Sequence, residues 1–244
     1  MPACPVEGFE VGFTGGDGAE RRVPLAEAAR LPLEEALPAR RIVSRRGQRH
    51  LPGQWWSATD GRHVGFESWL ERDHLMLLDF DPAVTAVASQ PFWLWWTAAD
   101  GTARRHAPDY FARRADGTGI VVDCRPEDRR GGDRDRDAFA AAREASGAAG
   151  WEYRLVGGCD RVLAGNVRWL AAYRHPRHRV PGVTARLLEA AVVPVPLMGL
   201  AVSAGDPLAV LPVLFHLLWR HELEAGLLVP LHPEAKVRAA GGGA

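Results

Sequence analysis

The sequence predicts an α/β fold followed by a smaller, mostly helical domain at the carboxyl end. An amphipathic helical pattern precedes two short β-rich stretches, and two further strands flank a tight turn. A helix, a strand and another helix then alternate as far as Arg174, which is typical of α/β units. With 244 residues, 47% of them apolar, the chain can bury a core in one generous domain or in a medium domain plus a small one.

Composition limits the classes of partner and compartment. Basic and acidic residues are equal at 30 each, so no global field attracts nucleic acid or an anionic membrane, and a polyanion must be held by local patches. Three widely spaced cysteines, Cys4, Cys124 and Cys159, argue against a disulfide framework and favour a reducing compartment. Prolines and charges interrupt every apolar run, so no stretch is long enough for a transmembrane helix. The start of the chain lacks the apolar segment of a signal peptide. We expect a cytoplasmic protein with no membrane partner.

The first part of the chain is the least regular. Residues 1–39 read as an N-terminal arm with a helix or two over 24–37. The segment that follows is rich in arginine and ends at the pair Trp55 and Trp56; its arginines are Arg40, Arg41, Arg45, Arg46 and Arg49. Arginines beside aromatic rings suit a phosphate backbone with stacked bases. The interpretation we prefer is a solvated arm whose tryptophans pack on the next domain.

The predicted elements then follow in order. Apolar residues at helical spacing predict a helix over 66–80, which places Glu67 and Glu71 on one face. The stretch 84–97 reads as two strands or one bent strand broken at Gln90-Pro91, with its tryptophans Trp93, Trp95 and Trp96 assigned to core or interface rather than to base stacking. The remaining predictions are strands over 104–114 and 118–126, a mobile charged loop over 127–137, a helix over 138–150, a strand over 151–157 and a helix over 165–174.

The carboxyl-terminal residues change in character. Residues 175–182 read as a linker, and 183–244 contain a small helix, a longer apolar helix ending near Arg220, and a short strand or wing. This order suits a helix-turn-helix with a wing. A small helical domain that docks a partner and never enters a DNA groove fits the same pattern.

The turn Asp116-Gly117 decides how two aspartates face each other. It favours a type I turn with Gly117 in the left-handed region and a three-residue loop over 115–117. Counting outward then places Asp109 opposite Asp123, with Arg125 on the same face. The other face collects a core made of Tyr110, Ala112, Ile120, Val122 and Cys124. A two-residue turn would instead put the two aspartates on opposite faces.

Opposed carboxylates destabilise a half-buried sheet unless something neutralises them. A divalent cation removes the conflict, and carboxylates without a histidine or thiolate are hard ligands suited to Mg²⁺ or Mn²⁺. The alternative is a structural salt bridge from Arg125, Arg105 or Arg113.

The order of acidic motifs resembles that of PD-(D/E)XK nucleases, which is Glu … Pro-Asp … (Asp/Glu)-x-Lys. This chain has an acid on a helix, then Pro-Asp on one strand, then Asp-x-basic on the next. A larger arrangement resembles the amino-terminal domain of TnsA-like endonucleases of heteromeric Tn7-type transposases. It consists, in order, of FESWLERDHLMLLDFDP, SQPF, HAPDYF, VVDCRP, a charged loop, a helix and WEYRLV. LPVLFHLLWRHELEAGLLVPL is similar to the winged-helix region of that family. The resemblance implies a restriction-endonuclease-like mixed sheet flanked by helices over 40–174 and a winged-helix-like domain over 183–244.

The resemblance also implies roles for individual residues. Asp109 and Asp123 take the places of the acids that ligate the metal, and Glu71 takes the place of the helix glutamate, which would complete or bridge the metal site. In this chemistry the metal ions organise an in-line attack by water on a phosphodiester. Arg125 stands where the family has lysine; arginine can offset charge and grip phosphate, but it cannot act as a base. Glu67 lies one turn earlier and could assist the site, but the role we prefer for it is a structural one at the surface.

The function implied is a Mg²⁺-dependent (or Mn²⁺-dependent) DNA endonuclease subunit that cuts at transposon ends. Its implied partners are DNA, a DDE-type transposase and an AAA+ ATPase regulator. Two alternatives stay open: a catalytically silent adaptor, in which Arg125 has inactivated the site and the chain binds DNA or the transposase, and a stand-alone restriction-type nuclease.

Overall fold

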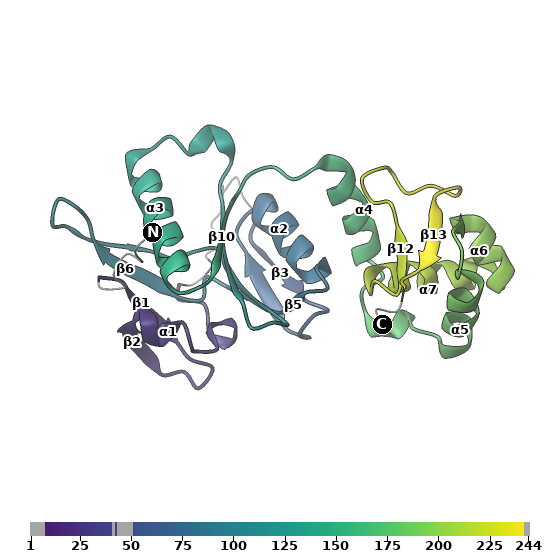
Figure 1. Ribbon diagram of the computed structural model, residues 1–244, viewed down its shortest axis with the longest axis horizontal. Coiled ribbons are helices and arrows are strands. Elements are labelled where there is room, and N and C mark those ends of the chain that lie inside the picture. Colours follow the sequence, from purple (N-terminus) through teal and green to yellow (C-terminus); the bar gives the residue numbers. More distant parts are fainter. Residues whose placement is uncertain (1–7, 41, 43–50, 242–244) are drawn as a thin grey trace. The chain divides into compact units, whose positions relative to one another are not determined.

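The computed structural model describes residues 8–40, 42 and 51–241 and divides into two compact units. The N-terminal unit is Met1–Gly158 and the C-terminal unit is Cys159–Ala244 (Figure 1). The chain is a mixed α/β protein, as predicted. Arg41, Arg45, Arg46 and Arg49 of the arginine-rich segment, and Cys4, lie outside the described residues.

The N-terminal unit is built on two sheets of four strands each among its described residues. The first has the order β2-β1-β6-β7 and the second the order β10-β9-β8-β5, while β3 and β4 form a separate hairpin. The strands are β1 (Glu10–Thr14), β2 (Glu20–Pro24), β3 (Gly53–Trp56), β4 (His63–Phe66), β5 (Val84–Ser89), β6 (Trp93–Thr97), β7 (Ala103–His106), β8 (Tyr110–Arg114), β9 (Gly119–Cys124) and β10 (Glu152–Val156). The helices are α1 (Leu25–Ala28), α2 (Trp69–Phe80) and α3 (Asp133–Ala148), with short 3₁₀ turns η1 (Leu33–Glu35) and η2 (Glu127–Arg129).

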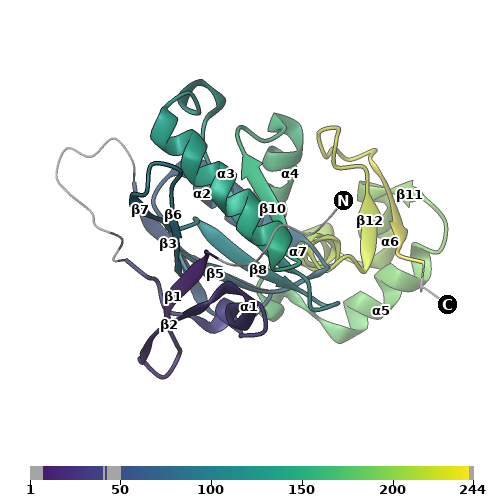
Figure 2. The same ribbon diagram turned by 60° about the vertical axis from the view of Figure 1, so that its left-hand side comes forward.

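The second sheet is covered on both faces. Strands β5, β8 and β9 are antiparallel, and β10 joins β9 in parallel after the crossover through α3. One face packs Tyr110, Ala112, Ile120 and Val122 with residues of α2, as predicted for this face of the hairpin. The opposite face packs Phe111 and Val121 with Ala142 and Ala145 of α3, which lies across this face in Figure 2. The hairpin that carries Asp109 and Asp123 is therefore held rigidly from both sides.

The predicted N-terminal arm is an integral part of this unit. Strand β1 pairs with β2 and also with β6, where Val11 lies opposite Leu94. Val11, Leu25 and Leu33 are fully buried in the same core as Phe111. Our separation of 1–39 from the following domain differs from the structure because the partner strand β6 lies about 80 residues further along the chain, so local patterns do not show the pairing.

Several elements match the sequence-based predictions, with shifted ends. Helix α2 begins after the cap residue Ser68 rather than at 66, and β5 and β6 are the two strands predicted over 84–97. The charged run 127–137 is not wholly a loop, because α3 begins at Asp133. The alternating Asp and Arg residues there support a helical turn through pairs such as Asp133 with Arg136, three residues apart.

The C-terminal unit combines helices with a small antiparallel sheet. Its helices are α4 (Arg161–Ala171), α5 (Pro181–Ala190), α6 (Leu197–Ala204) and α7 (Pro207–Trp219), with a 3₁₀ turn η3 (Pro176–His178). Strands β11 (Val195–Pro196), β12 (Leu223–Ala225) and β13 (Lys236–Ala239) form a sheet of order β11-β13-β12. The sequence analysis missed α6. Among the described residues, no helix has both the length and the apolar character needed to cross a bilayer.

The boundary between the units differs from the predicted linker. Residues 175–182 form η3 and the start of α5 inside the C-terminal unit, and α4 also belongs to this unit. The buried amide of Asn166 on α4 donates to the carbonyl oxygens of Leu227 (2.9 Å) and Val229 (2.7 Å) and accepts from the backbone of Leu231 (3.0 Å). These hydrogen bonds tie α4 to the segment between β12 and β13.

Candidate active site

The turn between β8 and β9 has the predicted geometry. Gly117 has a φ of +86°, and its N–H donates to the carbonyl of Arg114 at 3.0 Å. The strands pair in the register Tyr110 with Val122 and Arg113 with Gly119. Continuing this register by one residue places Asp109 opposite Asp123, so the predicted alignment is confirmed.

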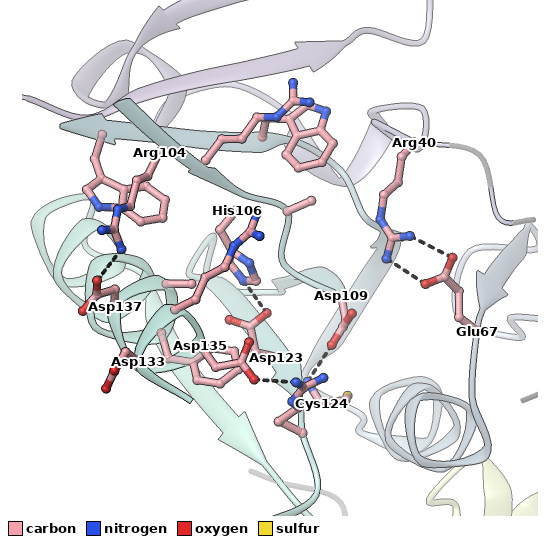
Figure 3. Close-up of a pocket in the computed structure, with 18 of the residues that line it drawn as sticks. Arg40, Glu67, Arg104, His106, Asp109, Asp123, Cys124, Asp133, Asp135 and Asp137 are labelled. Carbon is pink, nitrogen blue, oxygen red and sulfur yellow. Dashed lines mark hydrogen bonds and ion pairs between the residues drawn. The ribbon is translucent and has the colours of Figure 1, made fainter. Parts of the chain in front are cut away.

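A cavity of about 900 Å³ opens over this end of the hairpin. Glu71, Asp109, Asp123 and Arg125 all line it, and so does Arg40, the described arginine of the basic segment. Figure 3 shows Arg40, Asp109 and Asp123 among the residues around the cavity. These residues come from the loop before β3, from α2 and from the ends of β8 and β9. The fold therefore brings all four candidate catalytic residues to one cavity.

Asp109 carries an electrostatic conflict. Its Oδ2 accepts one hydrogen bond, from the backbone N–H of Cys124 at 2.7 Å. Loss of solvation, and then the nearby charges of Asp123 and Glu71, raise the pKa of the Asp109 carboxyl well above its usual range. The protein alone thus leaves the ionised form of Asp109 poorly compensated.

Asp123 is 1% exposed and is held at both oxygens. His106 Nε2 hydrogen-bonds to Oδ1 at 2.8 Å, and the hydroxyl of Tyr153 donates to Oδ2 at 2.8 Å. Burial, followed by the charge of Asp123, raises the pKa of the Tyr153 phenol above its usual range, so this hydroxyl keeps its proton. Neither residue was predicted from the sequence: Tyr153 reaches Asp123 from β10, the parallel neighbour of β9 in the same sheet, and His106 reaches it from β7 of the other sheet.

The side chain of Glu71 caps the start of α2 and also lines the cavity. Its Oε1 accepts from the hydroxyl of Ser68 at 2.8 Å and its Oε2 accepts from the N–H of Glu67 at 2.7 Å, while its own N–H donates to Ser68 Oγ at 3.2 Å. This is a variant of the capping box expected from the spacing Ser-x-x-Glu. Burial is the largest cause that raises the pKa of the Glu71 carboxyl. Glu67 forms an ion pair with Arg40 at 2.7 Å and also lines the cavity.

The predicted salt bridge from a neighbouring arginine is absent from the described part of the chain. Arg125 pairs with Asp135 of α3, and Arg113 pairs with Glu34 at 2.9 Å. The guanidinium of Arg105 lies over the ring of Trp93 instead. The alternative in which one of these arginines neutralises the two aspartates is therefore wrong.

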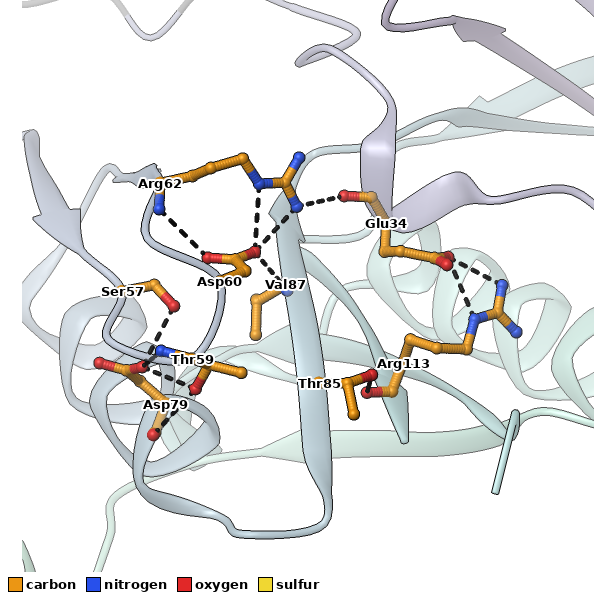
Figure 4. Close-up of polar contacts among 9 residues, drawn as sticks. All are labelled: Glu34, Ser57, Thr59, Asp60, Arg62, Asp79, Thr85, Val87 and Arg113. Atoms are coloured by element: carbon orange, nitrogen blue, oxygen red, sulfur yellow. Dashed lines mark hydrogen bonds and ion pairs between the residues drawn. The ribbon is translucent and has the colours of Figure 1, made fainter. Parts of the chain in front are cut away.

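A second buried carboxylate shows the contrast (Figure 4). Asp79, 5% exposed, accepts from Ser57 Oγ (3.1 Å), from the N–H and hydroxyl of Thr59 (2.9 and 2.8 Å) and from Trp55 Nε1 (2.8 Å). This set of donors satisfies Asp79 without a cation. The contact of Trp55 also agrees with the preferred interpretation that this tryptophan packs on the domain that follows.

The lining of the cavity carries more acidic than basic side chains. Five arginines face seven carboxyl groups there, which leaves an excess of two negative charges when all are ionised. No group of three His, Cys, Asp or Glu side chains in the described residues forms a ready-made metal cage. Mg²⁺ commonly uses one or two carboxylates together with waters and substrate phosphate, a mode that Asp109 and Asp123 fit.

Comparisons with known proteins found no matching family model and no matching curated protein. A function for this chain therefore has to be inferred from its own residues and their geometry.

Proposed function

We propose that this chain is a metal-dependent DNA endonuclease that acts with Mg²⁺ or Mn²⁺. The observation that carries the proposal is the pair Asp109 and Asp123, which lie opposite each other in one cavity with Glu71 and Arg125. The raised pKa of Asp109 supports it, because a hard cation would relieve the conflict that the protein leaves uncompensated. The second sheet, with its antiparallel strands β5, β8 and β9, its parallel strand β10 and the helices α2 and α3 on its two faces, supports a restriction-endonuclease-like fold.

Each residue has a role in this mechanism. Asp109 and Asp123 would hold the cation, which when bound lowers the pKa of the attacking water and stabilises the leaving oxygen. His106, which also lines the cavity, and Tyr153 orient the Asp123 carboxylate through their hydrogen bonds. Glu71 keeps its capping contacts and adds negative charge at the cavity wall.

Arg125 replaces a lysine in the motif that the chain resembles. A guanidinium stays charged, so it offsets charge on the phosphate but cannot take a proton from water. Its partner Asp135 lines the same cavity, and an incoming phosphate can replace this carboxylate as the partner of Arg125. We assign Arg125 to phosphate binding.

The C-terminal unit supports a role in docking a protein partner. The order α5, β11, α6, α7, β12, β13 supports a winged-helix-like unit, in which α7 would take the place of the recognition helix. All seven residues of α7 from Val213 to Trp219 are buried, so this helix has little polar surface with which to read bases. We therefore favour partner docking over groove reading for this unit.

The resemblance to TnsA-like endonucleases gives the biological setting that we propose. The chain would be the endonuclease subunit of a Tn7-like transposase in the cytoplasm, with a DDE-type transposase and an AAA+ ATPase as partners. The competing proposal is a silent adaptor, which the substitution of lysine by Arg125 favours.

Cleavage of supercoiled plasmid carrying the transposon ends tests the proposal. We expect nicking by the wild-type chain with Mg²⁺ or Mn²⁺ and the partner transposase. Asp109→Ala should reduce the rate by more than about 100-fold, since even the outer partners of metal ligands contribute about 10–100-fold. Asp116→Asn, at the exposed tip of the same hairpin, is the control and should cut normally. Equal nicking by wild type and Asp109→Ala would overturn the proposal, and no nicking by either would favour the adaptor. Nicking without the transposase would indicate a stand-alone nuclease.

Arg125→Lys is a stricter test of the same site. Lysine restores a charged amine at the position and can orient water, so we expect cleavage to be retained or increased. An inactive lysine variant beside an active parent would show that the site has been misplaced.

A further inference from the structure

One exposed arginine is held between two indole rings at the edge of the cavity. Trp93 and Trp95 of β6 share a face because side chains alternate along a strand, and Arg105 of β7 lies opposite Trp95. The guanidinium carbon of Arg105 is 4.2 Å from the ring centroid of Trp93 and 5.0 Å from that of Trp95. Gly12 on the adjacent strand β1 leaves room for the indole ring of Trp95, because a Cβ at Gly12 would lie 3.2 Å from Trp95 Nε1.

Arg105 differs from the neighbouring arginines of the described chain in having no carboxylate partner there. Arg22, Arg40 and Arg104 each pair with a carboxylate, Glu10, Glu67 and Asp137 respectively. Within the described residues no carboxylate pairs with Arg105, although the side chain is exposed. Stacking on the indoles fixes the plane of the guanidinium while the N–H donors along its edge stay open to an anion.

The position of Arg105 relates this anion site to the two aspartates. Arg105 and Trp93 line the same cavity as Asp109 and Asp123. A single fixed guanidinium suits a contact with a backbone phosphate, which carries no sequence information. Fixing the side chain before binding also lowers the entropic cost of the contact.

We propose that Arg105, held by Trp93 and Trp95, binds a backbone phosphate of the DNA strand next to the phosphate that is cleaved. This inference rests on the proposed nuclease function, and it adds a DNA-positioning residue outside the metal site. Trp93 acts through Arg105, as a support for the guanidinium, rather than by stacking on a base.

Binding measured without cleavage tests the inference separately from the proposed activity. Asp109→Asn serves as the parent, since it removes one negative charge from the cavity and one proposed metal ligand. Fluorescence anisotropy with a short DNA duplex is followed over a range of NaCl concentrations. Arg105→Ala should weaken binding about tenfold, in the range for a charged hydrogen bond. It should also reduce the slope of log K against log salt by about 0.9, which corresponds to one phosphate contact.

The support role of Trp93 gives a double-mutant test. Trp93→Ala should weaken binding without removing a charge, and Trp93→Ala/Arg105→Ala should bind no more weakly than Arg105→Ala alone. Additive losses would show that Trp93 contacts DNA itself and would overturn the support role.

Two stacked arginines provide matched controls. Arg72 lies 4.1 Å over Trp69 and pairs with Asp73, and Arg22 lies 4.4 Å over Trp95 and pairs with Glu10. Arg72→Ala and Arg22→Ala should change affinity less than about twofold, because a carboxylate already occupies each guanidinium. An unchanged affinity or salt slope in Arg105→Ala would overturn the inference, as would competition by inorganic phosphate as strong as that by DNA. If Arg105→Ala weakens binding while Asp109→Ala still cuts plasmid normally, the DNA contact stands and the assigned metal site fails.

Discussion

Among single residues, Asp109 and Asp79 differ in what compensates their burial. Asp79 receives hydrogen bonds from Trp55, Ser57 and Thr59, whereas Asp109 receives one from the backbone of Cys124 and faces other carboxylates. Because the pKa of Asp109 is raised in the folded state, its protonated form stabilises the fold at low pH. That stability is lost as the pH rises from near 3.8 through the raised pKa.

Asp109→Asn should therefore be more stable than the wild type at neutral pH when EDTA is present. The difference should grow as the pH rises above about 4 and level off once the pH has passed the raised pKa of Asp109, because only the wild type carries an ionisable group at this position. Each kcal/mol gained raises Tm by about 2–4 °C in a chain of this size. Thermal melts across this pH range check the prediction, and Mg²⁺ should stabilise the wild type more than the variant. A difference in Tm that does not change with pH would contradict it.

The two supports of Asp123 give a second prediction at this scale. Tyr153→Phe and His106→Ala each leave one oxygen of Asp123 without its hydrogen bond. Loss of such an outer partner lowers metal affinity by about 10–100-fold. We expect the Mg²⁺ concentration for half-maximal cleavage to rise, with the rate of Tyr153→Phe largely recovered at saturating Mg²⁺. A rate that stays low at every Mg²⁺ concentration would contradict a positioning role for Tyr153.

Among the elements, the β8–β9 hairpin was the most predictable from the sequence. Asp116-Gly117 specifies the turn locally, and the turn fixes the register that places Asp109 opposite Asp123. The partners of Asp123 were not predictable, because His106 and Tyr153 reach it from strands that are distant in the sequence, β7 of the other sheet and β10 beside β9. The same holds for the pairing of β1 with β6, since alternation along a strand does not show which distant strand it pairs with.

Gly119 tests how tightly the hairpin is packed. A Cβ at this position would lie 2.6 Å from Trp151 Cδ1 and 2.7 Å from Phe111 Cζ, both in the buried core. Gly119→Ala should lower the free energy of unfolding by about 1–3 kcal/mol through overpacking. Gly147→Ala, on α3 with open space around it, should instead raise stability by up to about 1 kcal/mol. Denaturant titration measures both, and a stabilised Gly119→Ala would show that the core accommodates the methyl group.

At the scale of the whole molecule, the two units have separate cores and separate proposed tasks. The cavity with Asp109 and Asp123 lies entirely in the N-terminal unit. The C-terminal unit buries Leu187, Leu200 and Leu214 in its own interior. The sequence showed the change in composition after residue 182 but not the boundary at Gly158, because the proline-rich segment 173–182 resembles a linker although it folds within the unit.

The boundary itself can be tested with two fragments. Helix α4 buries Val167, Leu170 and Ala171, and Asn166 binds the segment between β12 and β13. A fragment of residues 159–244 should therefore melt cooperatively by circular dichroism. A fragment of residues 175–244, close to the boundary predicted from sequence, lacks α4 and should melt at a lower temperature or without a cooperative transition.

The contribution of Asn166 can be separated from that of the apolar face of α4. Asn166→Ala in the 159–244 fragment removes its hydrogen bonds while α4 keeps its buried apolar residues. We expect it to cost about 1–3 kcal/mol, the range for leaving a buried polar partner unsatisfied. The variant should therefore melt at a lower temperature than the 159–244 parent. It should melt at a higher temperature than the 175–244 fragment, because removing α4 also exposes the apolar surface that α4 covers. Equal melting of all three would mean that α4 does not stabilise this unit and would move the boundary back towards residue 175.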